Sequence, residues 1–506
     1  MIYLNIDLYI YLIMKNYSLY KTTGLSMVML VIIMLNSCKT DTEKPTVQNE
    51  SKPNIIIITA DDLGWADIAG YGADLHETPN LDRLEKQSLK FTNAYAAAPV
   101  CTPTRASIMT GKYPARLHMT IWSEWAKNPQ FDQPLIPPDA VGNLPHKETT
   151  LAEVLKKAGY FTAHIGKWHL GDAANYPELH GFDINIGGSH WGCPPTFFYP
   201  YRGNIYKSER YVPGLGTDFD GNYFTSREGE YLTDRLTDEA LKIMKDTNGQ
   251  PFFLNLAYYT VHTPIEGKPE TVNHYLAKIE PDMHHQNADY AAMVYSLDEN
   301  IGRIVNKIDE LGIAENTILI FISDNGGFIG EWTSQKVTNN FPLRSGKGSL
   351  YEGGVRIPML IRYPGNTVPG SVCDEAVSTI DILPTIMQIL NISEPDQNIK
   401  TDGISIFSLM KNPDTRLNRD YLFWHYPHYY STTSPVSSAR QGEWKLLEYF
   451  EDGHVELYNL KDDPGEMNDL SDEMPDKTSK LLDALRNWQI EVNAQMPIVN
   501  PNFKKK

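Results

Sequence analysis

Four groups of polar residues in this sequence each follow a short apolar run. They are Asp61-Asp62 after 55–60, Lys167 and His169 after 160–165, His262 after 252–258, and Asp324-Asn325 after 317–322. Apolar runs rich in β-branched residues, without polar alternation, are typical of strands buried on both faces of a parallel sheet. Ligands of such sheets bind beyond the carboxyl ends of the strands. We therefore expect these side chains to meet at one edge of a sheet.

These residue types suit a hard metal ion and a multiply charged oxyanion. Carboxylate and amide oxygens favour Ca²⁺ or Mg²⁺ over thiophilic metals, and the candidates are Asp61, Asp62, Asp324 and Asn325. Cationic and imidazole groups bind oxyanions through charge-assisted hydrogen bonds. The candidates for that task are Arg105, Lys167, His169, His262 and Lys347, the last of which lies in a Gly/Ser loop at 345–348.

A further candidate is Cys101, at the start of the stretch 101–111. Pro103 suits the first turn of a helix, and Gly111 can end it. Cys101 is then expected at a helix N-terminus, where unpaired N–H groups stabilise an anion. Arg105 follows one turn later, on the same side of the helix.

The order Cys101-x-Pro103-x-Arg105, followed by Thr110-Gly111, resembles the sulfatase signature. Together with the four strand ends and Lys347-Gly348, it resembles the type I sulfatases of the alkaline-phosphatase-like superfamily over residues 54–460. The resemblance implies that a formylglycine-generating maturation enzyme oxidises Cys101 to formylglycine, whose hydrate is the nucleophile. It also implies one Ca²⁺, held by Asp61, Asp62, Asp324 and Asn325 with an oxygen of the modified residue 101.

The same resemblance implies roles for the remaining residues. Arg105, Lys167 and Lys347 would neutralise the sulfate. His262, with Lys347 as a second candidate, would protonate the leaving alcohol, and His169 would help to release sulfate and restore the aldehyde. The expected substrate is a sulfated sugar or oligosaccharide. Three aromatic residues are candidates for stacking on sugar faces, or equally for core packing: Trp191, Tyr199 and Trp424.

Two other functions remain as alternatives. A phosphatase or phosphodiesterase of the same superfamily uses Ser or Thr and usually two metals with more His ligands, so Cys101 argues against it. A surface lipoprotein that binds a glycan without turnover has no need of Cys101.

Strands alternate with helices along most of the chain, which predicts an α/β fold. We expect a large central, mostly parallel sheet flanked by helices. Three of the predicted helices bear on the fold. One contains Leu81, Leu84 and Leu89, and a second begins with a capping box formed by Thr150 and Glu153. The third contains Met293 and ends at Gly312. Residues 172–235 are rich in Gly, Pro and aromatics, which indicates long loops.

Four segments make up the predicted domain organisation. Residues 1–38 resemble a lipoprotein signal peptide, with Lys15 and Lys21 before the apolar run 27–35 and Cys38 as the lipidation site. Residues 39–52 are a flexible tether, 53–395 the catalytic domain, and 396–506 a smaller α+β subdomain. That subdomain is expected to have a short antiparallel sheet from 419–426, 442–449 and 454–460, and a helix through Leu481 and Trp488. The expected location is the bacterial cell envelope, periplasmic or surface-exposed, with a lipid anchor in the membrane.

The composition limits which partners and which cysteine-based features we expect. The formal net charge is −18, so we expect no nucleic acid partner. The four cysteines show no Cys-x-x-Cys pair. Cys193 and Cys373 could pair, but buried thiols are the preferred interpretation.

Overall fold

The computed structural model describes residues 52–126, 132–215, 229–393 and 399–504. The predicted signal peptide, its Cys38 and nearly all of the predicted tether lie outside these ranges. From Lys52 onward the chain forms one compact unit. Within the described residues, no helix combines the length and the apolar character that crossing a membrane requires.

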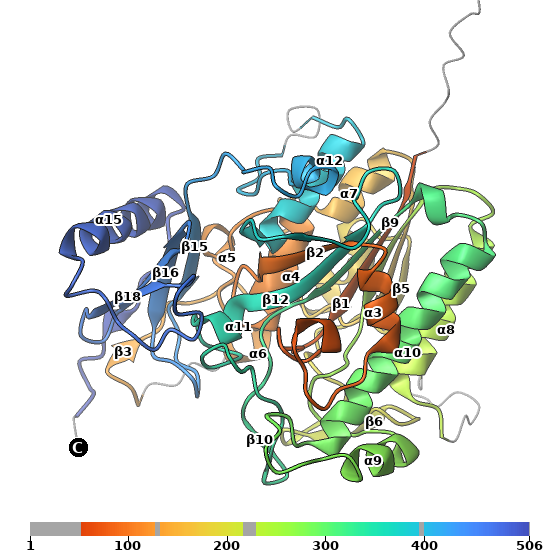
Figure 1. Cartoon of the computed structure of the whole chain (residues 1–506), viewed down its shortest axis with the longest axis horizontal. Coiled ribbons are helices and arrows are strands. Elements are labelled where there is room, and N and C mark those ends of the chain that lie inside the picture. The colour runs from red at the N-terminus through yellow and green to blue at the C-terminus, as the bar shows by residue number, and fades with distance from the viewer. Residues whose placement is uncertain (1–51, 127–131, 216–228, 394–398, 505–506) are drawn as a thin grey trace, which may run out of the picture. The chain divides into compact units, whose positions relative to one another are not determined.

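A nine-stranded mixed sheet forms the centre of the described chain (Figure 1). Its strand order is β13-β2-β12-β9-β1-β8-β4-β5, with β14 also paired to β2. Strands β9, β1, β8, β4 and β5 are mutually parallel, whereas β12 runs antiparallel to β9 and β2. The bounds are β1 Asn54–Ala60, β2 Leu89–Tyr95, β4 Phe161–Gly166, β5 Ile184–Ile186, β8 Phe252–Ala257, β9 Thr317–Ser323, β12 Arg356–Arg362, β13 Ser371–Cys373 and β14 Val377–Ser378. The predicted mostly parallel sheet is confirmed.

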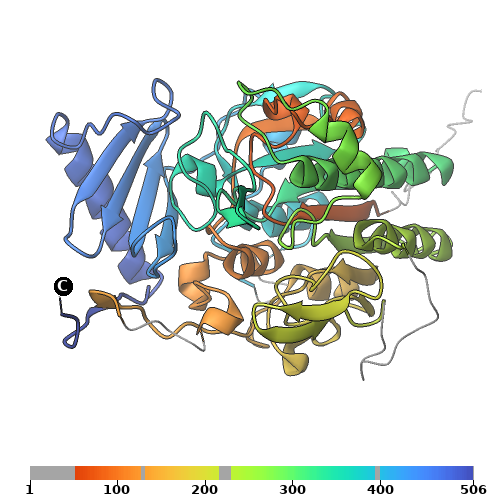
Figure 2. The same ribbon diagram turned by 90° about the horizontal axis from the view of Figure 1, so that it is seen from below.

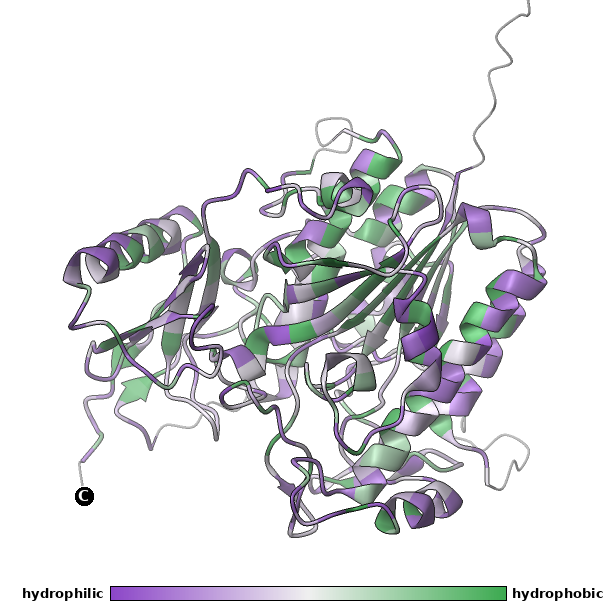
Figure 3. Ribbon diagram, in the orientation of Figure 1, coloured by the Kyte–Doolittle hydropathy of each residue, from purple (hydrophilic) through white to green (hydrophobic). Residues whose placement is uncertain are grey.

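Helices cover both faces of this sheet, which explains why its strands show no polar alternation. In β1, Ile56 and Ile58 belong to one buried cluster, whereas Ile55 and Ile57 belong to another. The first cluster includes helices α3 (Pro79–Glu85), α8 (Leu232–Asp246) and α10 (Ala288–Glu310). The second includes α4 (Cys101–Thr110), α7 (Leu151–Lys157) and α12 (Ile382–Ile389). Figure 3 shows the apolar strands between amphipathic helices.

Several predicted helix limits are confirmed. The Thr150–Glu153 capping box is present at the start of α7, and Gly111 ends α4 with a φ of 66°. One prediction is wrong: Leu89 does not continue α3 but begins β2, which also contains Ala94. Leu89 is buried in the sheet, so its helical spacing from Leu84 was coincidental.

The region 172–235 contains more regular structure than the sequence indicated. It holds β5 and a hairpin of β6 (Arg202–Ile205) and β7 (Ser208–Tyr211), and α8 begins inside it. The prediction of long loops is therefore wrong for these segments.

The C-terminal part folds as the predicted α+β unit. An antiparallel sheet in the order β15-β16-β17-β18 packs against α15 (Pro475–Glu491), as Figure 2 shows. Its strands are β15 Leu422–Tyr426, β16 Val436–Gln441, β17 Trp444–Tyr449 and β18 Val455–Asn459. The sequence did not predict β16. Residues of this sheet share a buried cluster with Tyr95 and Val100, directly before α4.

Shorter elements complete the described chain. They are β3 Leu135–Ile136, β10 Glu331–Trp332, β11 Gln335–Lys336, β19 Ile498–Val499, α5 Pro114–Leu117, α6 Ser123–Ala126, α9 Pro269–Leu276, α11 Glu352–Val355 and α14 Phe407–Lys411.

Candidate active site

The four predicted strand ends meet at one edge of the central sheet. Strands β1, β4, β8 and β9 are parallel neighbours, so the residues after them emerge on the same side. The N-terminus of α4 faces this edge, with Sγ of Cys101 3.6 Å from Oδ1 of Asp61 and 3.8 Å from Oδ1 of Asp62. Except for Cys38, every predicted site residue lies in this cluster or in the pocket above it.

Each of the three carboxylates is paired with a cation. Nζ of Lys167 lies 2.8 Å from both oxygens of Asp61. Nε of Arg105 donates to Asp324 over 2.9 Å, and its Nη1 donates to the Lys167 carbonyl over 2.8 Å. Lys347 Nζ donates to Asp62 over 2.7 Å.

Burial dominates the electrostatics of this centre. It raises the pKa of Asp61 to about 8, with Lys167 opposing the shift and the nearby Asp324 and Asp62 adding to it. Burial also acts to raise the pKa of Asp324, but Arg105 and Lys167 outweigh it, so that pKa is lowered. Three carboxylates crowded into a buried space favour a bound cation, because their mutual repulsion is costly there.

The Cys101 thiol is not set up to act as a thiolate. Burial raises its pKa far above the ordinary value, and the positive charges of Lys167 and Lys347 only partly oppose this. A thiol that stays protonated is a poor nucleophile. Its position at the first turn of α4 therefore suits a different group at residue 101 better than a free thiol.

Asn325 provides a test of whether a metal fits here. Its Nδ2 donates to Oδ1 of Asp62 over 2.8 Å, whereas its Oδ1 is buried and has no hydrogen-bond partner among the described residues. An unpaired buried amide oxygen beside three carboxylates matches the ligand preferences of Ca²⁺. The residues present thus fit a hard cation.

A second buried group with possible metal ligands lies nearby and was missed in the sequence: Asp67, His76 and His285. Asp67 accepts hydrogen bonds from the Gly64 N–H and the Tyr290 hydroxyl, each over 2.6 Å, and from the Thr338 hydroxyl. The oxygens of the Asp67 carboxylate thus already accept hydrogen bonds from three donors of the protein. It holds the loop that carries Asp61 and Asp62, so we interpret it as a support for that loop.

His262 belongs to the same cluster, since its ring nitrogen and the ligand atoms of Asp61, Asp62 and Cys101 all lie within 4.8 Å of one another. Its Nδ1 is 2.9 Å from the Thr263 carbonyl and 3.1 Å from the Thr263 hydroxyl. Its Nε2 is 3.1 Å from Lys347 Nζ. Burial, followed by the charge of Lys347, lowers the pKa of His262 well below its ordinary value.

His169 is fixed by a partner that the sequence did not reveal. Its Nε2 lies 3.0 Å from a carboxylate oxygen of Glu124 in α6, and its carbonyl accepts a hydrogen bond from Thr102 in α4 over 2.8 Å. Burial lowers the pKa of His169 to about 4, with Glu124 opposing the shift. The imidazole is thus neutral near neutral pH, held against the first turn of α4.

A pocket of about 900 Å³ opens above these groups. Its aromatic lining consists of Trp122, Trp125, Tyr206, Phe328, Tyr429 and Tyr430. Of the three aromatic residues named from the sequence, Trp424 is a core residue: it is 1% exposed, and its Nε1 donates to the Ala96 carbonyl. Cys193 and Cys373 are free and buried, as predicted.

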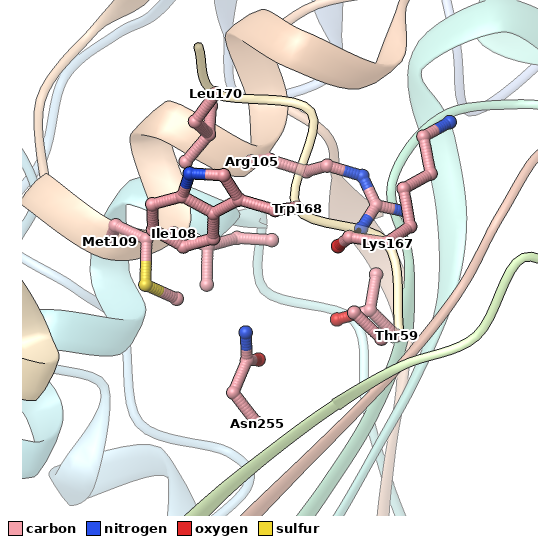
Figure 4. A pocket seen from close by; sticks show the side chains of 9 residues that line it. Thr59, Arg105, Ile108, Met109, Lys167, Trp168, Leu170 and Asn255 are labelled. Atoms are coloured by element: carbon pink, nitrogen blue, oxygen red, sulfur yellow. Dashed lines mark hydrogen bonds between the residues drawn. The ribbon is translucent and has the colours of Figure 1, made fainter. Parts of the chain in front are cut away.

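The floor of the site is packed against the helix layer, as Figure 4 shows. Arg105 reaches from α4 to the Lys167 backbone, with Thr59 and Asn255 on the strand side and Trp168 on the helix side. The residue Arg105 is 5% exposed. This packing fixes the cation that contacts Asp324.

Comparisons with known proteins agree with this arrangement. The family described as Sulfatase matches residues 53–392, and the one described as N-sulphoglucosamine sulphohydrolase, C-terminal, matches residues 346–494. A sulfatase of Formosa agariphila is 34% identical over 90% of this chain and 92% of its own length. The human N-acetylgalactosamine-6-sulfatase is 33% identical over 77% of this chain and 74% of its own length.

Solved structures show the same fold. Ps i-CgsB in complex with k-i-k-neocarrahexaose superposes with a TM-score of 0.71 and 29% sequence identity, covering 90% of this chain and 95% of that one. Among the functions considered from the sequence, these relatives favour sulfate ester hydrolysis. The chain belongs to the sulfatase family and is a sulfuric ester hydrolase.

Proposed function

We propose that this enzyme hydrolyses an O-sulfate ester on a sugar or oligosaccharide, with formylglycine made from Cys101 and one Ca²⁺. The observation that carries the proposal is the position of Cys101, whose Sγ lies within 3.8 Å of both Asp61 and Asp62 at the N-terminus of α4. The names of the relatives, which include an N-acetylgalactosamine-6-sulfatase and a structure in complex with a neocarrahexaose, support a carbohydrate substrate.

The proposed metal ligands are the buried oxygens around residue 101. They are Asp61, Asp62, Asp324, Asn325 and an oxygen of modified Cys101. A bound Ca²⁺ supplies positive charge beside the sulfuryl oxygens. Lys167, Lys347 and Arg105 surround the same space and would hold the sulfate group and neutralise charge that develops on it.

Formylglycine at position 101 supplies a hydrated aldehyde, one hydroxyl of which serves as the nucleophile toward sulfur. His262 would give a proton to the alcohol oxygen that leaves, with Lys347 beside it as a second donor. His169, held by Glu124, would accept a proton from the remaining hydroxyl at residue 101 as sulfate departs. Each of these groups contacts the cluster that contains Cys101 or lines its pocket.

The location of the enzyme is also part of the proposal. The motif that ends at Cys38 supports export and a lipid anchor in the bacterial cell envelope. Two partners follow: the membrane, through that anchor, and a maturation enzyme that replaces the Cys101 sulfur by a carbonyl oxygen.

Peptide mass spectrometry of active enzyme tests the central step. We expect the peptide with Cys101 to carry an aldehyde that reacts with a hydrazide probe, whereas the Cys193 peptide, also buried, stays unmodified. Cys101→Ala should abolish turnover of both aryl and sugar sulfates while the protein stays folded. An unmodified thiol at residue 101 in fully active enzyme would refute the formylglycine mechanism.

A further inference from the structure

Arg210 is a buried cation in the wall of the substrate pocket that the proposed mechanism does not use. It lies in β7 of the hairpin, lines the pocket and is 9% exposed. Its Nε donates to the Ser208 hydroxyl over 3.1 Å, and its Nη1 donates to Sγ of Cys193 over 3.2 Å. Both partners are uncharged.

Two aromatic rings lie against this guanidinium. Its central carbon lies 4.5 Å from the Trp191 ring centre and 5.6 Å from that of Tyr206. Stacking of this kind orients the fork of N–H donors without consuming it, because the donors point along the plane of the group. These contacts and the two hydrogen bonds restrain Arg210 and leave part of its donor capacity unused.

The Arg210 guanidinium is in direct contact with no carboxylate in the part of the chain that the structure describes. Within the described residues, no carboxylate oxygen lies within 4 Å of its guanidinium, whereas Arg105, Lys167 and Lys347 each have one at 2.9 Å or less. Two carboxylates line the same pocket. Asp62 pairs with Lys347, whereas Glu124 contacts His169. Burial acts to raise the pKa of Glu124, whereas His169 and, more weakly, Arg210 act to lower it, although Arg210 forms no ion pair with Glu124. A buried guanidinium with unused donors and no carboxylate in contact is costly, and an anion from outside the chain would complete its contacts.

The hairpin links Arg210 to the part of the pocket that holds the proposed acid, through Tyr206. Its neighbour Tyr206 shares a hydrogen bond of 2.7 Å with the hydroxyl of Thr263. Thr263 in turn contacts His262, the proposed acid for the leaving alcohol. The pocket of about 900 Å³ is lined by both Arg210 and His262 and has room for a sugar.

We propose that Arg210 binds a second anionic group of the substrate, a sulfate or a carboxylate, on the sugar that leaves or on the one next to it. The proposal rests on the proposed function and narrows its substrate class to sulfated sugars with at least two negative charges. The guanidinium fork matches the paired oxygens of either group. Arg210 would thus select the substrate, while Arg105, Lys167 and Lys347 handle the ester that is cleaved.

A matched substrate series tests this inference. kcat/KM is measured for N-acetylgalactosamine 6-sulfate, for its 4,6-disulfate, and for the same 6-sulfated sugar linked to glucuronic acid. A parallel series is built on galactose 4-sulfate, and 4-nitrocatechol sulfate reports on the catalytic groups alone. The enzymes are the wild type, Arg210→Gln, Arg210→Lys and, as a control, Arg202→Gln, since Arg202 lies in the same hairpin but pairs with Glu209.

We expect the wild type to prefer a dianionic sugar to its monosulfated counterpart by about 10- to 100-fold, the range expected for a hydrogen bond to a charged group. Arg210→Gln should bring this ratio close to one, Arg210→Lys should restore part of it, and Arg202→Gln should keep it. The arm that shows the preference identifies the second group as sulfate or carboxylate.

Three results separate the possible failures. Turnover of the monosulfated sugars with no preference for any dianionic sugar, or an equal loss on all substrates in Arg210→Gln, overturns the inference and leaves the proposed function intact. If the wild type hydrolyses the aryl sulfate but no sugar sulfate, the proposed carbohydrate substrate and the inference both fail. If the wild type hydrolyses neither the aryl ester nor any sugar sulfate, both the proposed function and the inference fail.

Discussion

Nζ of Lys347 lies 3.1 Å from Nε2 of His262. The two side chains come from distant segments and converge on Asp62, at 2.7 Å for Lys347 and 3.5 Å for His262. The other ring nitrogen of His262 is engaged by Thr263. Lys347 and His262 thus share the side of the site from which a leaving alcohol would be protonated. Because burial and the charge of Lys347 lower the pKa of His262, its role as the acid requires the negative charge of the bound sulfate to favour the protonated ring.

The choice of leaving group tests the role of His262. His262→Ala should lower kcat for a sugar sulfate by roughly 100- to 10,000-fold, since an alkoxide leaves poorly without a proton. It should lower kcat for 4-nitrocatechol sulfate far less, because a stabilised phenolate leaves unaided. Steady-state kinetics on both substrates provide the measurement, with the exposed His274 replaced by Ala as the control. An equal loss on both substrates would remove His262 from this role and leave Lys347 as the candidate.

Removal of the metal should abolish activity, and Asn325 offers a clean variant for this test. Among the described residues Asn325 pairs with no cation, so Asn325→Ala removes an amide oxygen without freeing a lysine or arginine. We expect Ca²⁺ affinity to fall by more than about tenfold, because even groups one step removed from a metal change affinity by 10- to 100-fold.

Elemental analysis and Ca²⁺ titration of chelator-treated enzyme measure this effect. Activity of the wild type should return with Ca²⁺, and Asn325→Ala should need a higher concentration. Asn306→Ala, at an exposed position that contacts Arg83, should behave as the wild type. Full activity of metal-free wild-type enzyme would contradict the assignment.

Tyr290 should affect Ca²⁺ binding although it is not one of the proposed metal ligands. Its hydroxyl donates to Asp67, which in turn accepts from the Gly64 N–H over 2.6 Å and so holds the loop after Asp62. Tyr290→Phe leaves a buried carboxylate one donor short, at a cost of about 1–3 kcal/mol in the free energy of unfolding. We also expect weaker Ca²⁺ binding that excess Ca²⁺ overcomes, with Tyr295→Phe in the same helix as the control. A loss of stability without any change in Ca²⁺ dependence would show that Tyr290 has no part in positioning the loop.

The strands that carry the site could be predicted because each is a run of apolar residues followed directly by polar ones. Strand β12 could not, since it contains Pro358, a residue that normally argues against an inner strand. The structure accommodates it where the register with β2 shifts, between Ile357 and Met359. Strand β2 was hidden by polar residues, because Lys90, Thr92 and Asn93 occupy partly buried positions and break up its apolar run.

The residues around the central cluster were harder to find than the cluster itself. Glu124 lies in a four-residue helix and Arg210 in a hairpin, and neither segment has a periodic pattern or follows a buried strand. Their contacts with His169 and the pocket depend on how distant segments pack. A motif in the sequence locates the groups around residue 101, whereas the groups that shape the substrate pocket require the fold.

Lys445 forms a buried charge cluster where β17 meets α11. Its Nζ lies 2.8 Å from Glu352 and 3.0 Å from Glu466, and all three side chains are fully buried. Burial acts to raise the pKa of Glu352, but Lys445 and two arginines outweigh it and lower that pKa to about 2. Burial raises the pKa of Glu466 to about 7, against the charge of Lys445.

These shifts have opposite consequences for stability. Because the pKa of Glu352 is lowered, its contribution is present above its unfolded pKa and is lost only in strong acid. Because the pKa of Glu466 is raised, its contribution is present in acid and is lost as the pH rises through about 7.

Lys445→Met should therefore destabilise the protein in a pH-dependent way. Without the ammonium group of Lys445, the two buried carboxylates lose the positive charge that compensates them. The free energy of unfolding should then fall by about 3–5 kcal/mol when the carboxylates are ionised. Protonation relieves this cost, so the difference in Tm between wild type and variant should be largest above the pKa of Glu466 and should shrink in mild acid. Thermal unfolding across this pH range measures the difference, and the shared titration of other groups cancels in it. Lys461→Met, which removes a charge that pairs with Glu443 at the surface, should change Tm little at any pH. If the Tm gap for Lys445→Met were constant with pH, the two glutamates would not carry the charges assigned to them.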